Sequence, residues 1–495
     1  MMPTIRPFRL KRSFILMAVV LGGCGIAGPD FHAPKPDTPS NWAVRIADVA
    51  NSAAPAEDWW RGFHDGELSS LIARAGSQNL DLQEAGLRIA EARVQERIAA
   101  ADLSSALGAN ASYANTRFSE TTAQGGLFNS LGSRSLPGVP IPRFPNPYDQ
   151  FQTGFDASWE PDLFGGVHRS MEAASANTQA SLEQRRDALV SVEAEIARAY
   201  VDLRGAQLKL SIVGENLNAQ RETLALTKDR LAARQGSELD VTNAAAQATA
   251  TQSEMPALQR QIDTDINQLS LLLAQGPDAL RPELEKSAAI PPVPPQVPVG
   301  LPADLTRRRP DIRAAEARLH AATARVGVAV ADLYPSIRFD APFGLQSERV
   351  AGLASWASAF YSIGPTISIP IFEGGRLRAT VELRETEEKE AGLDYAKTVL
   401  GALHDVENAL IAYSGERQHR QLLEATLAQN QDALSLATDR YRSGVASFLV
   451  VLDAERTLLA TELALADSTE AASIDLIALY KALGGGWQPQ EASQK

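Results

Sequence analysis

A short alternating segment runs almost directly into a very long helical segment between residues 151 and 240. Residues 151–160 alternate apolar and polar side chains, which is the period of a strand with one apolar face. After a turn at 162–166, no proline occurs until past residue 235. Apolar residues recur there every seven positions, which is typical of a coiled-coil seam: Ile196, Leu203, Leu210, Leu217, Leu224 and Leu231. A helix of about 70 residues would be roughly 105 Å long. No single globular core is that deep, so the segment predicts a conduit.

The net charge of the chain limits the kinds of partner that it is expected to bind. The net charge of the 495-residue chain is −13, which argues against nucleic acid and against anionic membrane surfaces as partners. The chain has one cysteine, Cys24, so it can form no intrachain disulfide.

The first 23 residues have the pattern of a secretory signal. A basic start is followed by an apolar run at 14–21 that is too short to span a bilayer. The run ends at Leu21-Gly22-Gly23-Cys24, which resembles the bacterial lipobox, and Gly25 resembles the residue found in lipoproteins sent to the outer membrane. We therefore predict cleavage after residue 23 and lipidation of Cys24, which would anchor the chain without a spanning helix. The alternative is a chance cysteine in an ordinary signal peptide.

The chain repeats itself. Residues 81–103 match 311–333 at an offset of 230, and the two long helical segments match at an offset of 210. A unit of helix, strand, strand, helix and helix is thus expected twice, in a mainly α chain with membrane β-strands. The predicted ranges are a signal peptide at 1–23, an extended N-terminal and equatorial region at 24–78, a first repeat at 79–287, a Pro-rich linker at 288–308, a second repeat at 309–483 and a tail at 484–495.

Four strands are expected, near residues 110–118, 151–160, 337–345 and 361–371, each with an apolar and a polar face. Such strands fit an outer-membrane wall. Because lipid cannot satisfy an open sheet edge, the wall must close. Single-chain barrels need about eight strands, so this chain should oligomerise. Two copies would give eight strands and three would give twelve, and the pattern alone does not choose. The alternative is a soluble β-sandwich, whose strands are not normally followed by helices this long.

Several short motifs together resemble the TolC/OprM-type outer-membrane efflux factors, in their lipoprotein branch. The matching pieces include Trp59-Trp60, Arg308-Arg309-Pro310-Asp311, Tyr334-Pro335-Ser336-Ile337, Pro370-Ile371-Phe372-Glu373-Gly374-Gly375, Arg440-Tyr441-Arg442-Ser443-Gly444 and Gly484-Gly485-Gly486-Trp487. The resemblance covers nearly all of the mature chain. It implies a homotrimer in the outer membrane, with a twelve-strand β-barrel continuous with a twelve-helix coiled-coil tunnel in the periplasm. It also implies a periplasmic adaptor and an inner-membrane pump as partners.

The resemblance also implies a gate at the periplasmic end of the helices. Leu449 and Asp453 match the family's hydrophobic and acidic rings, and Asp240 and Tyr441 match a pair that links the closed state. The alternative is that Leu449 packs in the seam and Asp453 is a solvated charge. One position departs from the pattern: where the second repeat has Gly444, the first has Arg234, so the first turn or its adaptor contact is expected to differ.

Enzyme chemistry finds no support in the sequence. The six histidines form no zinc spacing, and no phosphate loop or nucleophile elbow appears. We expect neither catalysis, nor a cofactor, nor a bound metal. The expected function is a passive exit duct of a tripartite efflux pump, from periplasm to exterior, gated at its helical tip. The alternatives are the exit duct of a type I protein secretion system and a periplasmic coiled-coil scaffold lipoprotein without a pore. The sequence does not name the cargo.

Overall fold

The computed structural model describes residues 25–44, 49–50, 58–123, 126, 146–294 and 297–487. This range leaves out the signal segment with Cys24, most of the loop between residues 116 and 148, and the end of the tail. The predicted lipidation site therefore lies outside the described residues. The chain divides into two compact units. Unit 1 consists of Met1–His32, Arg93–Ala176 and His320–Lys389, and unit 2 of Ala33–Ala92, Asn177–Leu319 and Glu390–Lys495.

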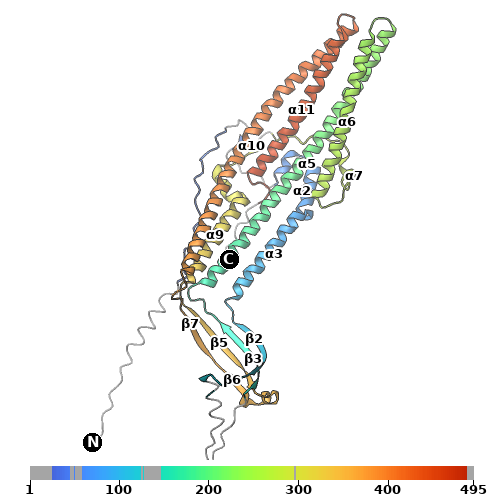
Figure 1. Cartoon of the computed structure of the whole chain (residues 1–495). Helices are drawn as coiled ribbons and strands as arrows, with labels where there is room; N and C mark the ends of the chain where they lie inside the picture. Colours follow the sequence, from blue (N-terminus) through green and yellow to red (C-terminus); the bar gives the residue numbers. More distant parts are fainter. Residues whose placement is uncertain are drawn as a thin grey trace, which may run out of the picture. The chain divides into compact units, whose positions relative to one another are not determined.

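Two long helical hairpins make up most of unit 2 (Figure 1). The first joins α5 (Gly166–Ala232) to α6 (Glu238–Leu272), and the second joins α10 (Arg376–Arg442) to α11 (Phe448–Ala482). The first residues of α5 and α10 belong to unit 1. The smaller elements outside the sheet are β1 (Val49–Ala50), η2 (Trp59–Phe63), α2 (Gly66–Gln78), α3 (Leu80–Ala101), α7 (Arg281–Leu284), β4 (Val297–Pro298), η3 (Pro302–Asp304), α8 (Leu305–Arg308) and α9 (Pro310–Ala331).

The predicted duplication is confirmed by the lengths and spacing of the helices. α3 and α9 are both 22 residues long and begin 230 positions apart. α5 and α10 both have 67 residues, α6 and α11 both have 35, and each pair begins 210 positions apart. Equal helix lengths in both repeats mean that their turns fall at equivalent positions.

The predicted seam lies in the core of unit 2. Ile196 and Leu203 on α5 and Val406 on α10 are fully buried, and all three belong to one apolar cluster. The cluster also contains Trp59, whose ring stacks on Tyr480 at a centroid distance of 5.2 Å. The heptad positions therefore hold the helices of this unit together, as their spacing predicts.

Unit 1 contains one antiparallel sheet. Its strands are β2 (Ala106–Thr116), β3 (Tyr148–Trp159), β5 (Ser336–Ser347), β6 (Ala359–Tyr361) and β7 (Gly364–Ser368). They are ordered β2–β3–β5, and β6 and β7 both pair with the far side of β5. The β3–β5 pairing joins the first repeat to the second. In the described residues, β2 on one side and β6 and β7 on the other have no further strand beside them.

The register confirms the two-faced pattern. Phe155 lies opposite Ala109 on one side and Phe343 on the other, and Phe343 lies opposite Tyr361. Two rows further along this face, Trp159 lies opposite Phe339. Side chains alternate across a strand, so the rows between carry the opposite face: Gln152 lies between Ser112 and Gln346. The aromatic face is largely exposed in the single chain, with Phe155 at 54% and Tyr361 at 73%.

Strand boundaries differ from those expected. β2 begins at Ala106 rather than near residue 110, and the strand expected over 361–371 is split into β6 and β7, with Ser362 and Ile363 between them. Pro365 lies within β7, opposite Phe339. Pro370 lacks the N–H that a continuing ladder needs, and β7 ends before it, at Ser368. Alternation alone registers neither this missing donor nor the break at residues 362 and 363, so it overestimated the length of that strand. No helix in the described parts of the chain is both long and apolar enough to cross a membrane.

Candidate functional site

The two turns that join the long hairpins have the same backbone structure. In the first, the N–H of Arg234 donates to the carbonyl of Leu231 (2.9 Å) and that of Gln235 to Arg230 (2.8 Å). In the second, Gly444 donates to Tyr441 (3.0 Å) and Val445 to Arg440 (2.9 Å). Each pair of bonds is a Schellman motif, which satisfies the last carbonyls of a helix.

The turn with Arg234 does not differ in backbone conformation from the turn with Gly444. The φ angle is +59° at Arg234 and +75° at Gly444, so both residues are in the left-handed region. A residue with a Cβ is strained there by roughly 1–2 kcal/mol. The departure noted in the sequence therefore places strain and a cation at the first turn while its shape is unchanged.

A small apolar cluster lies beneath the turns. The rings of Tyr441 and Phe448 are 5.6 Å apart, and both side chains are buried. The cluster comprises Ala244, Ala437, Tyr441, Phe448, Val451 and Leu452. It packs α6 against the ends of α10 and α11, because Ala244 comes from α6.

Leu449 and Asp453 project away from this cluster. Both are exposed, Leu449 at 57%, whereas Phe448 and Leu452 beside them are buried. Residues four apart lie on the same face of a helix, so Leu449 and Asp453 form one stripe on α11. Within the single chain neither packs in the seam.

Asp240 and Tyr441, the predicted linking pair, make no hydrogen bond with each other within the described residues of the single chain. Asp240 Oδ2 accepts from the N–H of Ser237 (3.3 Å), and its own N–H donates to Ser237 Oγ (3.2 Å), which makes a capping box at the start of α6. The Tyr441 hydroxyl is buried and has no hydrogen-bond partner in the described residues. Burial, together with the charge of Asp240, raises the pKa of Tyr441.

Arg230 on α5 is the residue that does contact Tyr441. Its guanidinium carbon lies 4.6 Å from the centre of the Tyr441 ring. Nη1 donates to the carbonyl of Tyr441 and to that of Arg442 (3.2 Å), and Nη2 donates to the carbonyl of Gln235 (3.5 Å). The sequence reading missed this contact.

Arg230 is the last member of a polar row on α5. Lys209 Nζ lies 2.9 Å from Asp467 and 3.0 Å from Glu470, and Asn216 donates to Glu462. Thr223 Oγ1 donates to Glu455 Oε1 (2.8 Å). We call Lys209, Asn216, Thr223 and Arg230 the polar row. Its members are seven residues apart, and each precedes a seam leucine by one position, which is a signal that the sequence contained.

The acids that face the polar row are partly removed from water. Burial raises the pKa of Glu455, against the opposing effect of the Thr223 hydrogen bond. Burial also raises the pKa of Glu470, although Lys209 opposes it. Since a buried acid without its donor is costly, these contacts hold α5 beside α11 specifically.

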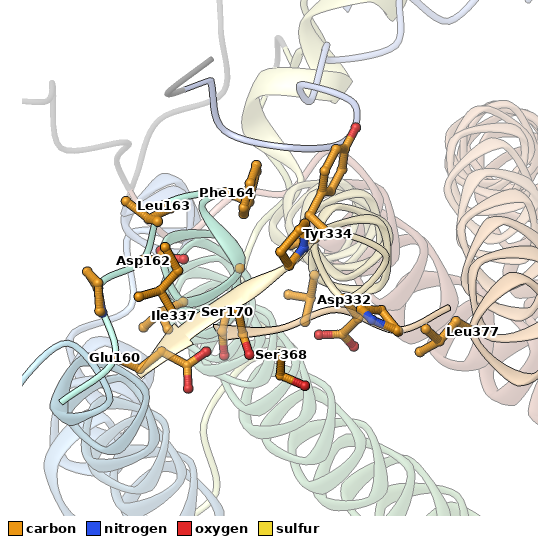
Figure 2. A pocket seen from close by; sticks show the side chains of 18 of the residues that line it. Glu160, Asp162, Leu163, Phe164, Ser170, Asp332, Tyr334, Ile337, Ser368 and Leu377 are labelled. Atoms are coloured by element: carbon orange, nitrogen blue, oxygen red, sulfur yellow. The ribbon is translucent and has the colours of Figure 1, made fainter. Parts of the chain in front are cut away.

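A separate cavity of about 620 Å³ lies in unit 1, where the strands meet the helices (Figure 2). Its lining includes Glu160, Asp162 and Asp332, with Arg376 as its one basic residue. Phe164 and Tyr334, which also line it, stack with their ring centres 4.7 Å apart. None of the predicted gate residues lines this cavity.

The chain is similar to known proteins over most of its length. The model of the family described as "Outer membrane efflux protein" matches residues 71–275 and 301–485. The chain is 32% identical over 475 residues to outer membrane protein OprJ of Pseudomonas aeruginosa, covering 96% of this chain and 95% of OprJ. It is 31% identical over 487 residues to the toluene efflux pump outer membrane protein TtgC of Pseudomonas putida, covering 97% and 96%.

Solved structures give the same result. The outer-membrane channel OprN superposes with a TM-score of 0.83 at 33% identity, over 94% of this chain and 100% of that one. The outer membrane channel MtrE of Neisseria gonorrhoeae, solved in an open state, gives 0.77 at 28% identity, over 93% and 98%.

Proposed function

The chain belongs to the family of outer membrane efflux proteins and is an outer-membrane channel of that type, and we propose that three copies of it assemble into one exit duct. The sheet of unit 1 supports this proposal. It has an exposed aromatic face, and within the described residues the strands on both sides have no further strand beside them. Three sheets joined edge to edge would supply twelve strand positions, counting β6 and β7 as one, and would close the wall that lipid requires.

The partners follow from the same architecture. The exposed turn tips of the two hairpins would meet a periplasmic adaptor, which would connect the duct to an inner-membrane pump. Arg234, Leu239 and Val445 are all exposed at these tips. Similar proteins are named for antibiotics, toluene and cations, so selection of the cargo is assigned to the pump rather than to the duct.

Lipidation at Cys24 is part of the proposal, with the signal ending at residue 23. The segment that follows is bound to unit 1: the N–H of Ala27 donates to the carbonyl of Phe164 (2.9 Å), and Arg169 Nη2 contacts Asp30 (2.6 Å). A chain held this close after the cysteine would keep an acyl anchor beside the sheet. Palmitate labelling of the wild type and its loss in Cys24→Ser test this. Unchanged labelling in the variant would refute it.

The gate assignment rests on the stripe formed by Leu449 and Asp453 and on Asp240 and Tyr441, which match the family's linking pair. In a trimer, three copies of Asp453 near one axis would repel one another, and the helix ends must be held against that repulsion. The division of the rest of the chain is also part of the proposal: the repeats at 79–287 and 309–483, the linker at 288–308 and the tail at 484–495.

Single-channel recording in planar bilayers tests the duct and its gate together. The purified lipidated protein should form ion-conducting channels, and Asp453→Ala should raise their conductance. Asp432→Ala is the matched control, because Asp432 is also exposed but lies on α10, away from the stripe. A wild-type protein that never permeabilises the bilayer would overturn the proposed function. Equal currents for both variants would remove Asp453 from the gate.

A further inference from the structure

The Arg230 side chain lies between the two turns. It starts on the last turn of α5 and donates to carbonyls of both hairpins: Gln235 in its own turn, and Tyr441 and Arg442 at the end of α10. A Cβ placed on Gly444 would lie 3.7 Å from Arg230 Nη2, so the guanidinium lies against the second turn as well. The Nε atom is buried and has no partner in the described residues.

The acceptors are chemically suited to a cation. The last carbonyls of a helix have no partner within the helix and carry the negative end of its dipole. A planar guanidinium can donate to two of them while its face covers an aromatic ring, in a fixed geometry that an ammonium group lacks. Arg230 thus acts as a C-cap for a helix of the other repeat.

The equivalent residue of the second repeat does not return this contact. Arg440 lies 210 positions after Arg230, at the same place in its Schellman motif. Its side chain is exposed and makes no side-chain hydrogen bond or ion pair within the described residues. The first hairpin therefore holds the second through one side chain, and the chain supplies its own matched control.

We infer that Arg230 is a positioning residue for the gate, which holds the α10–α11 tip against the α5–α6 tip in the resting duct. The inference rests on the proposed function. Any opening that separates the two tips must break the contacts of Arg230 with the Tyr441 ring and with the carbonyls at the end of α10. Tyr441 then holds the two tips together through the face of its ring, which Arg230 covers, and not through its hydroxyl.

The first experiment compares Arg230→Met with Arg440→Met in planar bilayers. Each change removes one cation from the same turn position. We expect Arg230→Met to raise the ratio of open to closed time about tenfold, which corresponds to about 1.4 kcal/mol. Arg440→Met should match the wild type. Arg230→Lys should fall between, because it keeps the charge and loses the planar fork. Equal behaviour of the two methionine variants would overturn the inference.

The second experiment separates the ring of Tyr441 from its hydroxyl. Tyr441→Phe keeps the ring face and should behave as the wild type, whereas Tyr441→Leu removes the ring but leaves the main-chain carbonyls, so it should open the duct less than Arg230→Met does. The double variant Arg230→Met/Tyr441→Leu should open no further than Arg230→Met alone, because the ring contact is already lost with Arg230. If Tyr441→Phe opens the duct as much as Tyr441→Leu, the hydroxyl holds the gate and the inference fails.

The duct and the role of Arg230 are refuted by different results. Absence of any wild-type channel refutes the duct itself. A conducting wild type whose gating ignores Arg230→Met refutes only the role of Arg230. Heat resistance of the trimer in detergent, measured for every variant, identifies loss of assembly: a variant that conducts more but assembles less counts against the inference.

Discussion

Arg234 and Gly444 occupy the same position in two equivalent turns, and both have positive φ, at +59° and +75°. The same pairing recurs at the other end of the last helices, where Ala274 (+55°) stands opposite Gly484 (+69°). In both places the first repeat has a side chain where the second has glycine. The duplicated backbone is thus preserved by hydrogen bonding even where the residue disfavours it.

Arg234→Gly should stabilise the first turn. Relief of the left-handed strain is worth roughly 1–2 kcal/mol, and the greater freedom of glycine in the unfolded chain offsets about 0.4–1 kcal/mol of it. We expect slower amide exchange at residues 234 and 235 by a few-fold. Gly444→Ala should have the opposite effect in the second turn. Faster exchange in Arg234→Gly would show that the arginine side chain supports the turn.

Thr223→Val should destabilise the contact between α5 and α11. The change keeps the shape and removes the donor to buried Glu455, which costs about 1–3 kcal/mol. Adding Glu455→Leu should recover most of this loss, because no buried acid is then left without a partner. Denaturant midpoints of the four proteins form the test. If the two substitutions lower the stability independently and additively, the hydrogen bond between Thr223 and Glu455 contributes nothing to the stability.

Glu193 should make the protein less stable as pH rises. Burial raises its pKa to about 9, from an ordinary value of 4.5. Between these values the unfolded chain releases the proton while the folded chain keeps it, so the free energy of unfolding falls by up to about 1.4 kcal/mol per pH unit. Glu193→Gln removes this dependence and should become the more stable protein toward pH 9. Denaturation at pH 6 and 8.5 measures the difference. Glu195→Gln, an exposed neighbour, should show no such divergence.

Gly327→Ala should loosen the segment that follows the lipidation site. A Cβ at Gly327 would lie 2.8 Å from Arg169 Cγ, and Gly28 approaches Gly327 so closely that its own Cβ would lie 2.4 Å from the Gly327 Cα. Overpacking of this kind costs about 1–3 kcal/mol. We expect faster proteolysis within residues 25–32. Gly86→Ala is the control, because a Cβ there meets nothing within 4 Å. Unchanged cleavage in both variants would contradict the prediction.

Much of the fold was predictable because two simple periods run through the chain. The seven-residue seam identified the long helices, and the period of two identified the faces of β3 and β5, whose register confirms them. Strand ends were harder to predict, since Pro370, just past the end of β7, lacks a hydrogen-bond donor that alternation does not register. The stripe of Leu449 and Asp453 was found through resemblance, and its role stays a prediction.

The contact of Arg230 could not be predicted from its own helix. Its acceptors in the other hairpin are main-chain carbonyls more than 200 positions away, and carbonyls leave no signature in a sequence. Asp240 illustrates the converse. Its carboxylate is used locally by Ser237, as the capping-box spacing allows, and this local use competes with the distant partner that resemblance suggested.

Because the strands at both ends of the described sheet are unpaired, the stability of unit 1 should depend on the concentration of the protein. In the part of the chain that the structure describes, a lone subunit leaves the outer edges of β2 and β7 without partner strands and its aromatic face exposed to water. Association supplies both, so mass action links the folding of this sheet to the number of copies nearby. Dilution should therefore unravel the strands before it affects the helical hairpins, whose seams lie largely within one chain.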